Sequence, residues 1–145
     1  MKILARVQNG DSQNEVHLST DGKPHSIQIP PKPTGFGSSI NGGELLFLAL
    51  ATCYVNDIYR EAGKRNIPVS KIEVEVSGDF DAEGEPGRGI VYDVVVTSTA
   101  STESILDLMK HTDQVAEIHN TLRTATDVRL RTANGISLGE QTDSN

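Results

Sequence analysis

The stretch Leu45-Leu46-Phe47-Leu48-Ala49-Leu50-Ala51-Thr52-Cys53-Tyr54-Val55 decides the fold of this chain, because it is apolar almost all round. A helix without a polar face must be covered on every side by protein or by lipid. The stretch falls well short of the roughly 20 residues that a helix needs to cross a bilayer. It therefore predicts a central helix buried in protein, and it carries Cys53, the single cysteine of the chain.

Length, charge and cysteine content indicate one domain in a reducing compartment. The 145 residues suit a single domain, and 13 Lys and Arg against 20 Asp and Glu give a net charge of −7. No basic stripe exists, so neither nucleic acid nor a membrane surface is an expected partner. There is no signal-peptide pattern, and a lone cysteine excludes a disulfide framework. We expect a cytoplasmic protein with a single domain over 1–145, of which 133–145 form a polar, loosely held tail.

The remaining pattern predicts an α+β domain with mostly antiparallel sheet around the central helix. Asp21-Gly22 is a typical hairpin turn between two strands. The central helix is expected to begin with Asn41 as N-cap and Glu44 as the other half of a capping box. It should end near 64–66, because Pro68 prevents its continuation. The predicted order is β-β-β-α-β-β-α-α-β, with strands at 3–9, 14–20, 24–30, 71–76, 90–96 and 127–131, and later helices at 105–109 and 115–122.

The central helix and its flanks resemble the OsmC/Ohr family of osmotically inducible and organic-hydroperoxide-resistance proteins. The resemblance runs over residues 3–132 and is most specific at 43–54, which is similar to the family's "ELLlaALatC" motif. Asn66-Ile67-Pro68-Val69 resembles its post-helix connection, and Asn120-Thr121-Leu122 resembles the end of its second-cysteine motif. Proteins of this family are typically intertwined homodimers in which one thiol attacks an organic hydroperoxide and a second thiol resolves the sulfenic acid. The resemblance implies an OsmC-like fold, an intertwined homodimer and Cys53 at the attacking position.

Other positions depart from the family pattern. Ala116 stands at the position of the second cysteine and Glu117 at the proline that follows it, so a resolving thiol is absent. The arginine that assists family peroxidases from the N-terminal region has no counterpart at 11–15, and Arg6 is the only nearby substitute. The assisting glutamate often lies ten residues before the cysteine, whereas Glu44 lies nine before it. If the protein is a peroxidase, it must therefore use an external thiol reductant.

The residues around Cys53 bear on its reactivity. Glu44 is about 13.5 Å away along the helix and about 180° around it, so it could meet only the thiol of a partner chain. Its alternative role is capping alone. Asp57 at i+4 is expected to raise the pKa of the thiol, and Arg60 can pair with Asp57. His119 occupies the serine position of the family motif and is a candidate to stabilise a thiolate.

The sequence is compatible with two functions and does not decide between them. In the first, Cys53 reduces organic hydroperoxides, with Glu44, His119 and Arg6 as further candidate catalytic residues. In the second, catalysis has been lost and the homodimer binds a small lipophilic molecule in an apolar cleft. A cysteine in an apolar helix can also be a plain core residue. No cofactor is expected, and no spacing of histidine, cysteine and carboxylate residues predicts a metal.

Overall fold

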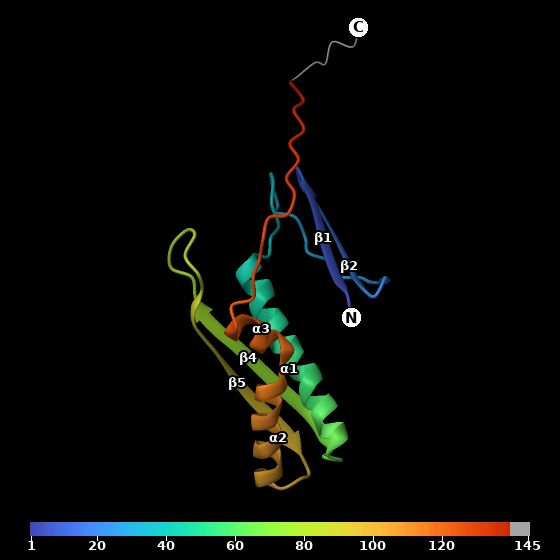
Figure 1. Cartoon of the computed structure of the whole chain (residues 1–145), viewed down its shortest axis with the longest axis vertical. Helices are drawn as coiled ribbons and strands as arrows, with labels where there is room; N and C mark the ends of the chain where they lie inside the picture. The colour runs from blue at the N-terminus through green and yellow to red at the C-terminus, as the bar shows by residue number, and fades with distance from the viewer. Residues whose placement is uncertain (140–145) are drawn as a thin grey trace.

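Helix α1 (Gly42–Lys64) runs through the middle of the molecule, with β1 and β2 on one side and β4 and β5 on the other (Figure 1). The computed structural model describes residues 1–139. The α+β class, the predicted order as far as the third helix and the antiparallel pairing are confirmed. The elements around α1 are β1 (Ile3–Gly10), β2 (Gln13–Thr20), β3 (Lys23–His25), β4 (Val69–Asp79), β5 (Arg88–Ser98), α2 (Thr102–Val115) and α3 (Glu117–Arg123).

Helix α1 begins and ends where its sequence predicts. The Asn41 side chain accepts a hydrogen bond from the Glu44 amide at 2.8 Å, and Glu44 Oε2 accepts one from the Asn41 amide at 2.8 Å. This reciprocal pair is the predicted capping box. At the other end, Asn66 adopts a left-handed backbone with φ of 54°, which asparagine tolerates better than most residues. Pro68 then prevents another turn.

The strands form two separate antiparallel sheets in the described part of the chain. One has the order β1-β2-β3 and the other pairs β4 with β5. Asp21 and Gly22 both have positive φ, 48° and 79°, as a tight hairpin turn between β2 and β3 requires. In the second sheet, Ile72 lies opposite Val96. Alternation therefore places one apolar face of this sheet toward α1.

Three expectations about the strands are wrong. Residues 127–131 form no strand, and Val128 and Leu130 are 93 % and 86 % exposed. A strand needs a neighbouring edge, and no other segment of residues 1–139 pairs with this one. The third strand ends at His25 rather than at 30. Beyond it, the Ile29 carbonyl accepts a hydrogen bond from the Asn14 side-chain amide at 2.9 Å instead of one from the backbone of a neighbouring strand. The expected strands do not join into one sheet within residues 1–139, which hold one sheet of three strands and one of two.

The core lies on one side of α1. Tyr54, Ile58 and Ala62 of α1 pack with Leu108 of α2, and apolar residues of β4 and β5 complete the cluster. The Tyr54 hydroxyl donates to the Met109 carbonyl at 2.8 Å, which fixes α2 against α1. The other side of α1 is uncovered, since 54 % of Leu48 is exposed. Within residues 1–139, this chain therefore closes only one side of the helix.

The C-terminal residues follow α3 without regular structure. Residues 124–139 contain no helix or strand, and all of them are exposed; the loosely held tail from 133 onward stays a prediction. The last part of the expected tail, 140–145, lies outside the described residues. No helix within residues 1–139 combines the length and the apolar character that crossing a membrane would need.

Candidate functional site

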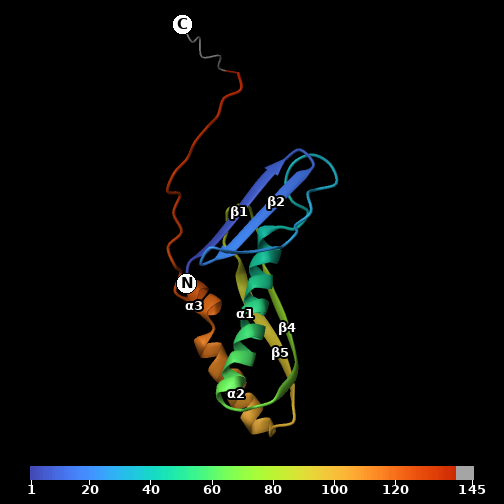
Figure 2. The ribbon, with the colours of Figure 1, turned by 90° about the vertical axis from the view of Figure 1, so that its right-hand side faces the viewer.

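An apolar groove of about 800 Å³ runs between α1 and the N-terminal sheet. Figure 2 shows β1 and β2 beside the N-terminal half of α1, and side chains from both line the groove. On α1 the lining residues recur at helical spacing, which makes them one continuous stripe. The stripe is apolar at its start and polar at its end, in the order Leu45, Leu48, Ala49, Thr52, Cys53, Asn56, Asp57 and Arg60.

Cys53 lies where the apolar and polar parts of the groove meet. Its thiol donates a hydrogen bond to Asp57 Oδ2 at 3.3 Å. Asp57 is held in turn by Arg60, whose Nη1 lies 2.9 Å from Asp57 Oδ1. The same nitrogen lies 3.0 Å from Glu117 Oε1 on α3. The predicted pairing of Arg60 with Asp57 is confirmed, and Arg60 ties the thiol site to a second helix.

A second layer of charges fixes Arg60. Its Nε lies 2.9 Å from Glu61 Oε1, and Glu61 also accepts a hydrogen bond from Lys64 at 2.9 Å. His111 of α2 approaches Glu61 Oε2 at 3.2 Å. Hydrogen bonds from Lys64, Arg60 and His111 lower the pKa of Glu61 to about 2. Glu61 is therefore ionised throughout the physiological range and holds the guanidinium at Nε, while Nη1 contacts Asp57 and Glu117.

The surroundings of Cys53 favour its protonated form. Burial raises the pKa of the thiol, and the hydrogen bond to Asp57 and the charges of Asp57 and Glu117 raise it further. The backbone amide of Ile118 acts in the opposite direction. Burial also raises the pKa of Asp57, whereas its hydrogen bond with Cys53 lowers it. The site thus holds a thiol that donates to a carboxylate, as the sequence suggested, rather than a preformed thiolate.

Three carboxyl and thiol groups are close enough to consider a metal. Ligand atoms of Cys53, Asp57 and Glu117 all lie within 4.8 Å of one another. However, the Arg60 guanidinium already lies against both carboxylates. The positive charge that a metal ion would supply to this cluster is therefore provided by the chain itself.

The other predicted site residues lie away from Cys53 within one chain. Glu44 is exposed in the capping box, in agreement with the helix geometry. Arg6 is exposed on β1 between Ala5 and Val7, which line the groove, so alternation points it to the opposite face. The structure does not bring Glu44, Arg6 or His119 to the Cys53 thiol.

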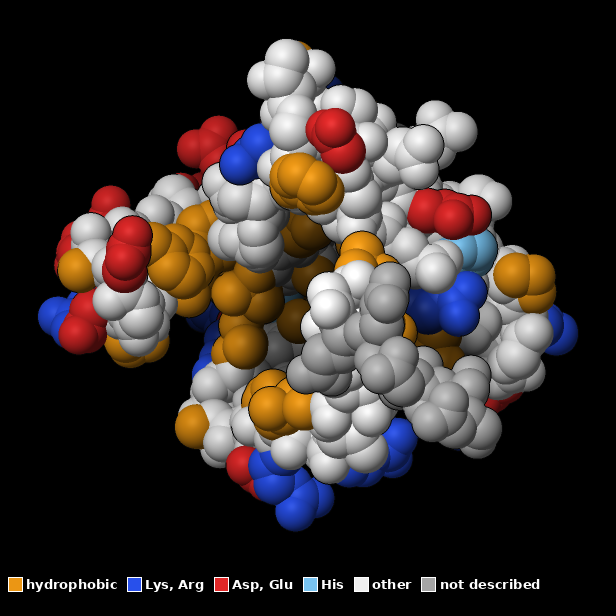
Figure 3. All heavy atoms as spheres, turned by 90° about the horizontal axis from the view of Figure 1, so that it is seen from above, with side chains coloured by type: hydrophobic (Ala, Val, Ile, Leu, Met, Phe, Trp, Pro, Cys, Tyr) orange, Lys and Arg blue, Asp and Glu red, His pale blue; other side chains and the backbone are white. Residues whose placement is uncertain are grey.

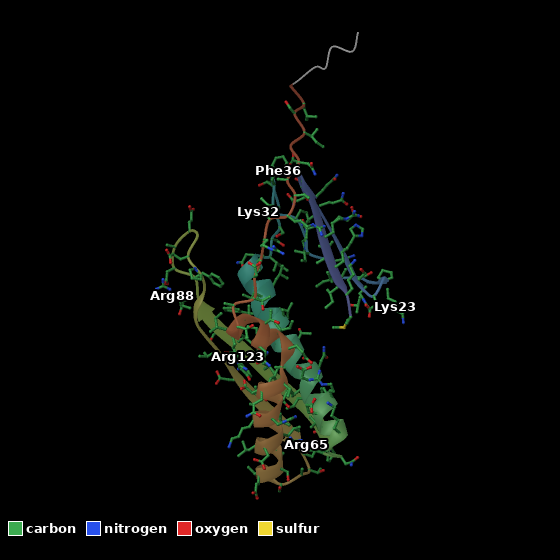
Figure 4. The ribbon with its side chains drawn as sticks, in the orientation of Figure 1. Lys23, Lys32, Phe36, Arg65, Arg88 and Arg123 are labelled. Carbon is green, nitrogen blue, oxygen red and sulfur yellow. The ribbon has the colours of Figure 1, made fainter. Side chains whose placement is uncertain are left out.

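His119 lies on the core side of α1. Its ring centroid is 4.8 Å from that of Tyr92 and 6.0 Å from that of Tyr54. The residue is 5 % exposed, and neither ring nitrogen has a hydrogen-bond partner among residues 1–139. Burial and the nearby Arg123 lower the pKa of His119. Arg123, labelled on α3 in Figure 4, is paired with Asp113 Oδ1 at 2.7 Å.

Two functional contacts were missed in the sequence. Glu117 and Ile118 come to Cys53 from α3, which is far away along the chain. A signal was present, because these residues directly follow Ala116, the position that aligns with the family's second cysteine. The similarity to the second-cysteine motif thus marks the segment that contacts the Cys53 thiol, through Glu117 and Ile118 rather than through His119.

Comparison with known families agrees with this architecture. The family described as OsmC-like protein matches residues 35–131, about two thirds of the chain. The chain belongs to this family of OsmC-like proteins. The match covers α1, the β4–β5 sheet and both later helices, including Cys53 and the α3 residues that contact it. No curated protein shows significant sequence similarity to the chain.

Solved structures share the fold at low sequence identity. An OsmC-like protein from Mycoplasma pneumoniae is 21 % identical, with 81 % of this chain and 87 % of that chain covered and a TM-score of 0.55. An OsmC-like hydroperoxide resistance protein from Jannaschia sp. CCS1 is 17 % identical, with 93 % and 96 % covered and a TM-score of 0.55. An OsmC-like protein of unknown function from Vibrio cholerae is 15 % identical, with 83 % and 93 % covered and a TM-score of 0.57. These similarities establish the fold.

Proposed function

We propose that the protein reduces organic hydroperoxides at Cys53, near a dimer interface, with an external thiol as reductant. The observation that carries this proposal is the thiol at the boundary between the apolar and polar parts of the groove. An apolar organic group fits the stripe that starts at Leu45, and its peroxy group then lies at the polar end beside Cys53. Among the structures with the same fold is one named a hydroperoxide resistance protein, which supports the reaction class.

The proposed reaction balances with one cysteine. The Cys53 sulfur attacks the peroxide, the O–O bond breaks, and the products are Cys53 sulfenic acid and the alcohol. One external thiol condenses with the sulfenic acid to give a mixed disulfide and water. A second external thiol releases Cys53 as a thiol and leaves with the first as a disulfide. The chain has no other cysteine to perform this resolution, and the reducing cytoplasm is the compartment that we propose for it.

A homodimer is part of the proposal. Leu48 of α1 and Val7 of β1 are more than half exposed along the groove, and Val128 and Leu130 are almost fully exposed. Figure 3 shows apolar side chains gathered around a hollow at one end of the molecule. Apolar surface and free strand edges of this kind favour association, at about 25 cal/mol per Å² buried. A second copy would cover the open side of α1 and could pair with residues 127–131.

The proposed dimer also bears on whether the other candidate catalytic residues can contact a Cys53 thiol. Glu44 and Arg6 are exposed, so either could reach the Cys53 of a second copy. His119 is packed between Tyr54 and Tyr92, so a role at the thiol would require its ring to leave the core. Light scattering at micromolar concentration should give twice the monomer mass of 15.6 kDa. A monomer mass would remove the dimer from the proposal.

Mass spectrometry tests the reaction itself. Brief treatment with one equivalent of cumene hydroperoxide in the presence of dimedone should give a dimedone adduct on Cys53, the signature of a sulfenic acid. Cys53→Ser is the control and should give none. An unmodified Cys53 at complete hydroperoxide recovery would reject the peroxidase function.

A second candidate function uses the same groove without chemistry. The raised pKa of Cys53 keeps the thiolate population small at neutral pH, which favours a protein that binds a small lipophilic molecule. In that case an apolar fluorescent probe should bind wild type and Cys53→Ser equally well, and dimedone should not label the wild type. Labelling of Cys53 by dimedone would instead support hydroperoxide reduction and reject the purely binding function.

A further inference from the structure

We propose that Asp57 is a catalytic residue that accepts the thiol proton of Cys53 and returns it to the leaving alkoxide, while Arg60 positions its carboxylate. This inference rests on the proposed hydroperoxide reduction and names the proton carrier of that same site. The sequence resemblance points to Glu44 and Arg6 as assistants of the thiol, whereas the geometry within the chain points to Asp57 and Arg60.

The two carboxylate oxygens of Asp57 have different partners. Oδ2 accepts the hydrogen bond from the Cys53 thiol at 3.3 Å, and Oδ1 lies 2.9 Å from Arg60 Nη1. The side chain is only 6 % exposed, so water does not compete freely for either oxygen. One oxygen is thereby held against the reacting sulfur, which is the placement that proton transfer requires.

Arg60 has its own fixed position. Its guanidinium contacts Asp57, Glu61 and Glu117, three carboxylates on two helices. These contacts restrict the rotation of Asp57 about its side-chain bonds and keep Oδ2 toward the thiol. Fixing a catalytic group in its working orientation removes part of the entropic cost of the reaction.

No other acceptor within residues 1–139 takes the thiol proton. The two histidines nearest the site are engaged elsewhere, since His111 contacts Glu61 and His119 packs against Tyr92. The charged and titratable groups that face Asp57 are Cys53 and Arg60 on α1 and Glu117 on α3. Burial raises the pKa of Asp57, which makes its protonated form a more accessible intermediate than that of a solvated carboxylate.

The proton balance is closed. Asp57 takes the proton as the Cys53 sulfur attacks the distal oxygen of the hydroperoxide. The O–O bond breaks, the distal oxygen stays on sulfur, and the leaving alkoxide takes the proton back from Asp57. Cys53 thiol and hydroperoxide thus give Cys53 sulfenic acid and alcohol with no net proton exchange with solvent.

Asp57→Asn tests this role because two reactions of Cys53 should change in opposite directions. Loss of the Asp57 charge lowers the pKa of the thiol, so iodoacetamide alkylation at pH 7 should become faster. Alkylation needs no proton donor, whereas hydroperoxide reduction does. Reduction of cumene hydroperoxide should therefore slow by about 100-fold or more, the typical contribution of a general acid.

Glu117→Gln is the matched control. It removes one charge from the same cluster, and the Glu117 charge also raises the pKa of Cys53, but Glu117 accepts no hydrogen bond from the thiol. Alkylation should become faster in this variant, whereas hydroperoxide reduction should fall far less than in Asp57→Asn, because Glu117 only helps to position Arg60 and the Asp57 carboxylate is still present. In Asp57→Glu, which keeps a carboxylate, hydroperoxide reduction should recover part of what Asp57→Asn loses.

A measurement on the unaltered protein covers the case in which Asp57→Asn does not fold. The leaving group of peracetic acid is acetate, which needs no proton. The leaving group of tert-butyl hydroperoxide is a strongly basic alkoxide, which does. With a proton donor at the thiol, the protein should show a smaller preference for peracetic acid over tert-butyl hydroperoxide than free cysteine does.

The outcomes separate this inference from the proposed function. If the wild type forms no sulfenic acid, the hydroperoxide reduction itself is wrong. If the wild type reacts but Asp57→Asn accelerates or slows both rates in parallel, the proton-transfer role of Asp57 is wrong. A preference for peracetic acid equal to that of free cysteine overturns it as well.

Discussion

The two sides of α1 are both apolar over its N-terminal half but have different surroundings. On one side, Tyr54 and Ile58 are buried against β4, β5 and α2. On the other, Leu48 and its neighbours face the open groove in which Cys53 lies. The first side stabilises the fold, and the second presents a thiol to whatever occupies the groove. The apolar half of one helix can therefore serve two purposes, because its neighbours rather than its own sequence decide which face is closed.

The largest expected effect concerns the groove side. Cys53→Ser should abolish hydroperoxide consumption, because no other thiol is present to attack. The free energy of unfolding should change little, since Cys53 is half-buried and serine is close to it in size. A xylenol-orange assay of peroxide and a urea unfolding curve measure the two properties. Turnover that survives in Cys53→Ser would show that the thiol is not the reactive group.

The next effect concerns the core side. Ile58→Ala should lower the free energy of unfolding by about 2–5 kcal/mol, because it leaves a cavity among fully buried side chains. The matched variant Leu48→Ala, at an exposed position of the same helix, should cost the isolated chain much less. Urea unfolding followed by circular dichroism gives both values. At concentrations where the proposed homodimer forms, the loss for Leu48→Ala should rise toward that for Ile58→Ala, and a loss that stays small would show that the second copy does not cover Leu48.

A smaller effect separates the capping role of Glu44 from a role at the thiol. Glu44→Ala should cost about 0.5–2 kcal/mol by analogy with other cap losses. Glu44→Gln should cost little, because an amide oxygen can still accept the hydrogen bond from the Asn41 amide. The rate of Cys53 alkylation is the second readout. A changed rate in a Glu44→Gln variant of unchanged melting temperature would indicate that Glu44 acts on the thiol of a second copy.

The smallest effect is a pH dependence at the outer end of the charged cluster. The pKa of Glu61 is lowered from 4.5 to about 2, so the folded state binds its proton less readily than the unfolded state. The stabilisation is therefore present above pH 4.5 and is lost as the pH falls toward 2. Urea unfolding of wild type and Glu61→Gln should show a difference at pH 6 that shrinks by pH 3. A constant difference would contradict the role of the charge.

Local features of the chain were predictable because they depend on neighbours within one helical turn or one hairpin. The capping box at Asn41, the end of α1 before Pro68 and the turn at Asp21-Gly22 all belong to this class. So does the pairing of Asp57 with Arg60 three residues later. The position of Cys53 on the central helix follows from the same pattern.

Long-range placement was decided by the tertiary structure. Only the path of the chain after α2 brings Glu117 and the Ile118 amide to the thiol and places His119 in the core. Periodicity also predicted a strand at 127–131, which forms none in this chain because a strand is stable only beside another edge. The sequence by itself thus determined α1, its caps and its thiol, which depend on local hydrogen bonds and side-chain spacing. The tertiary structure determined which face of α1 is closed and which charges surround Cys53, since contacts between distant segments depend on how the whole chain packs.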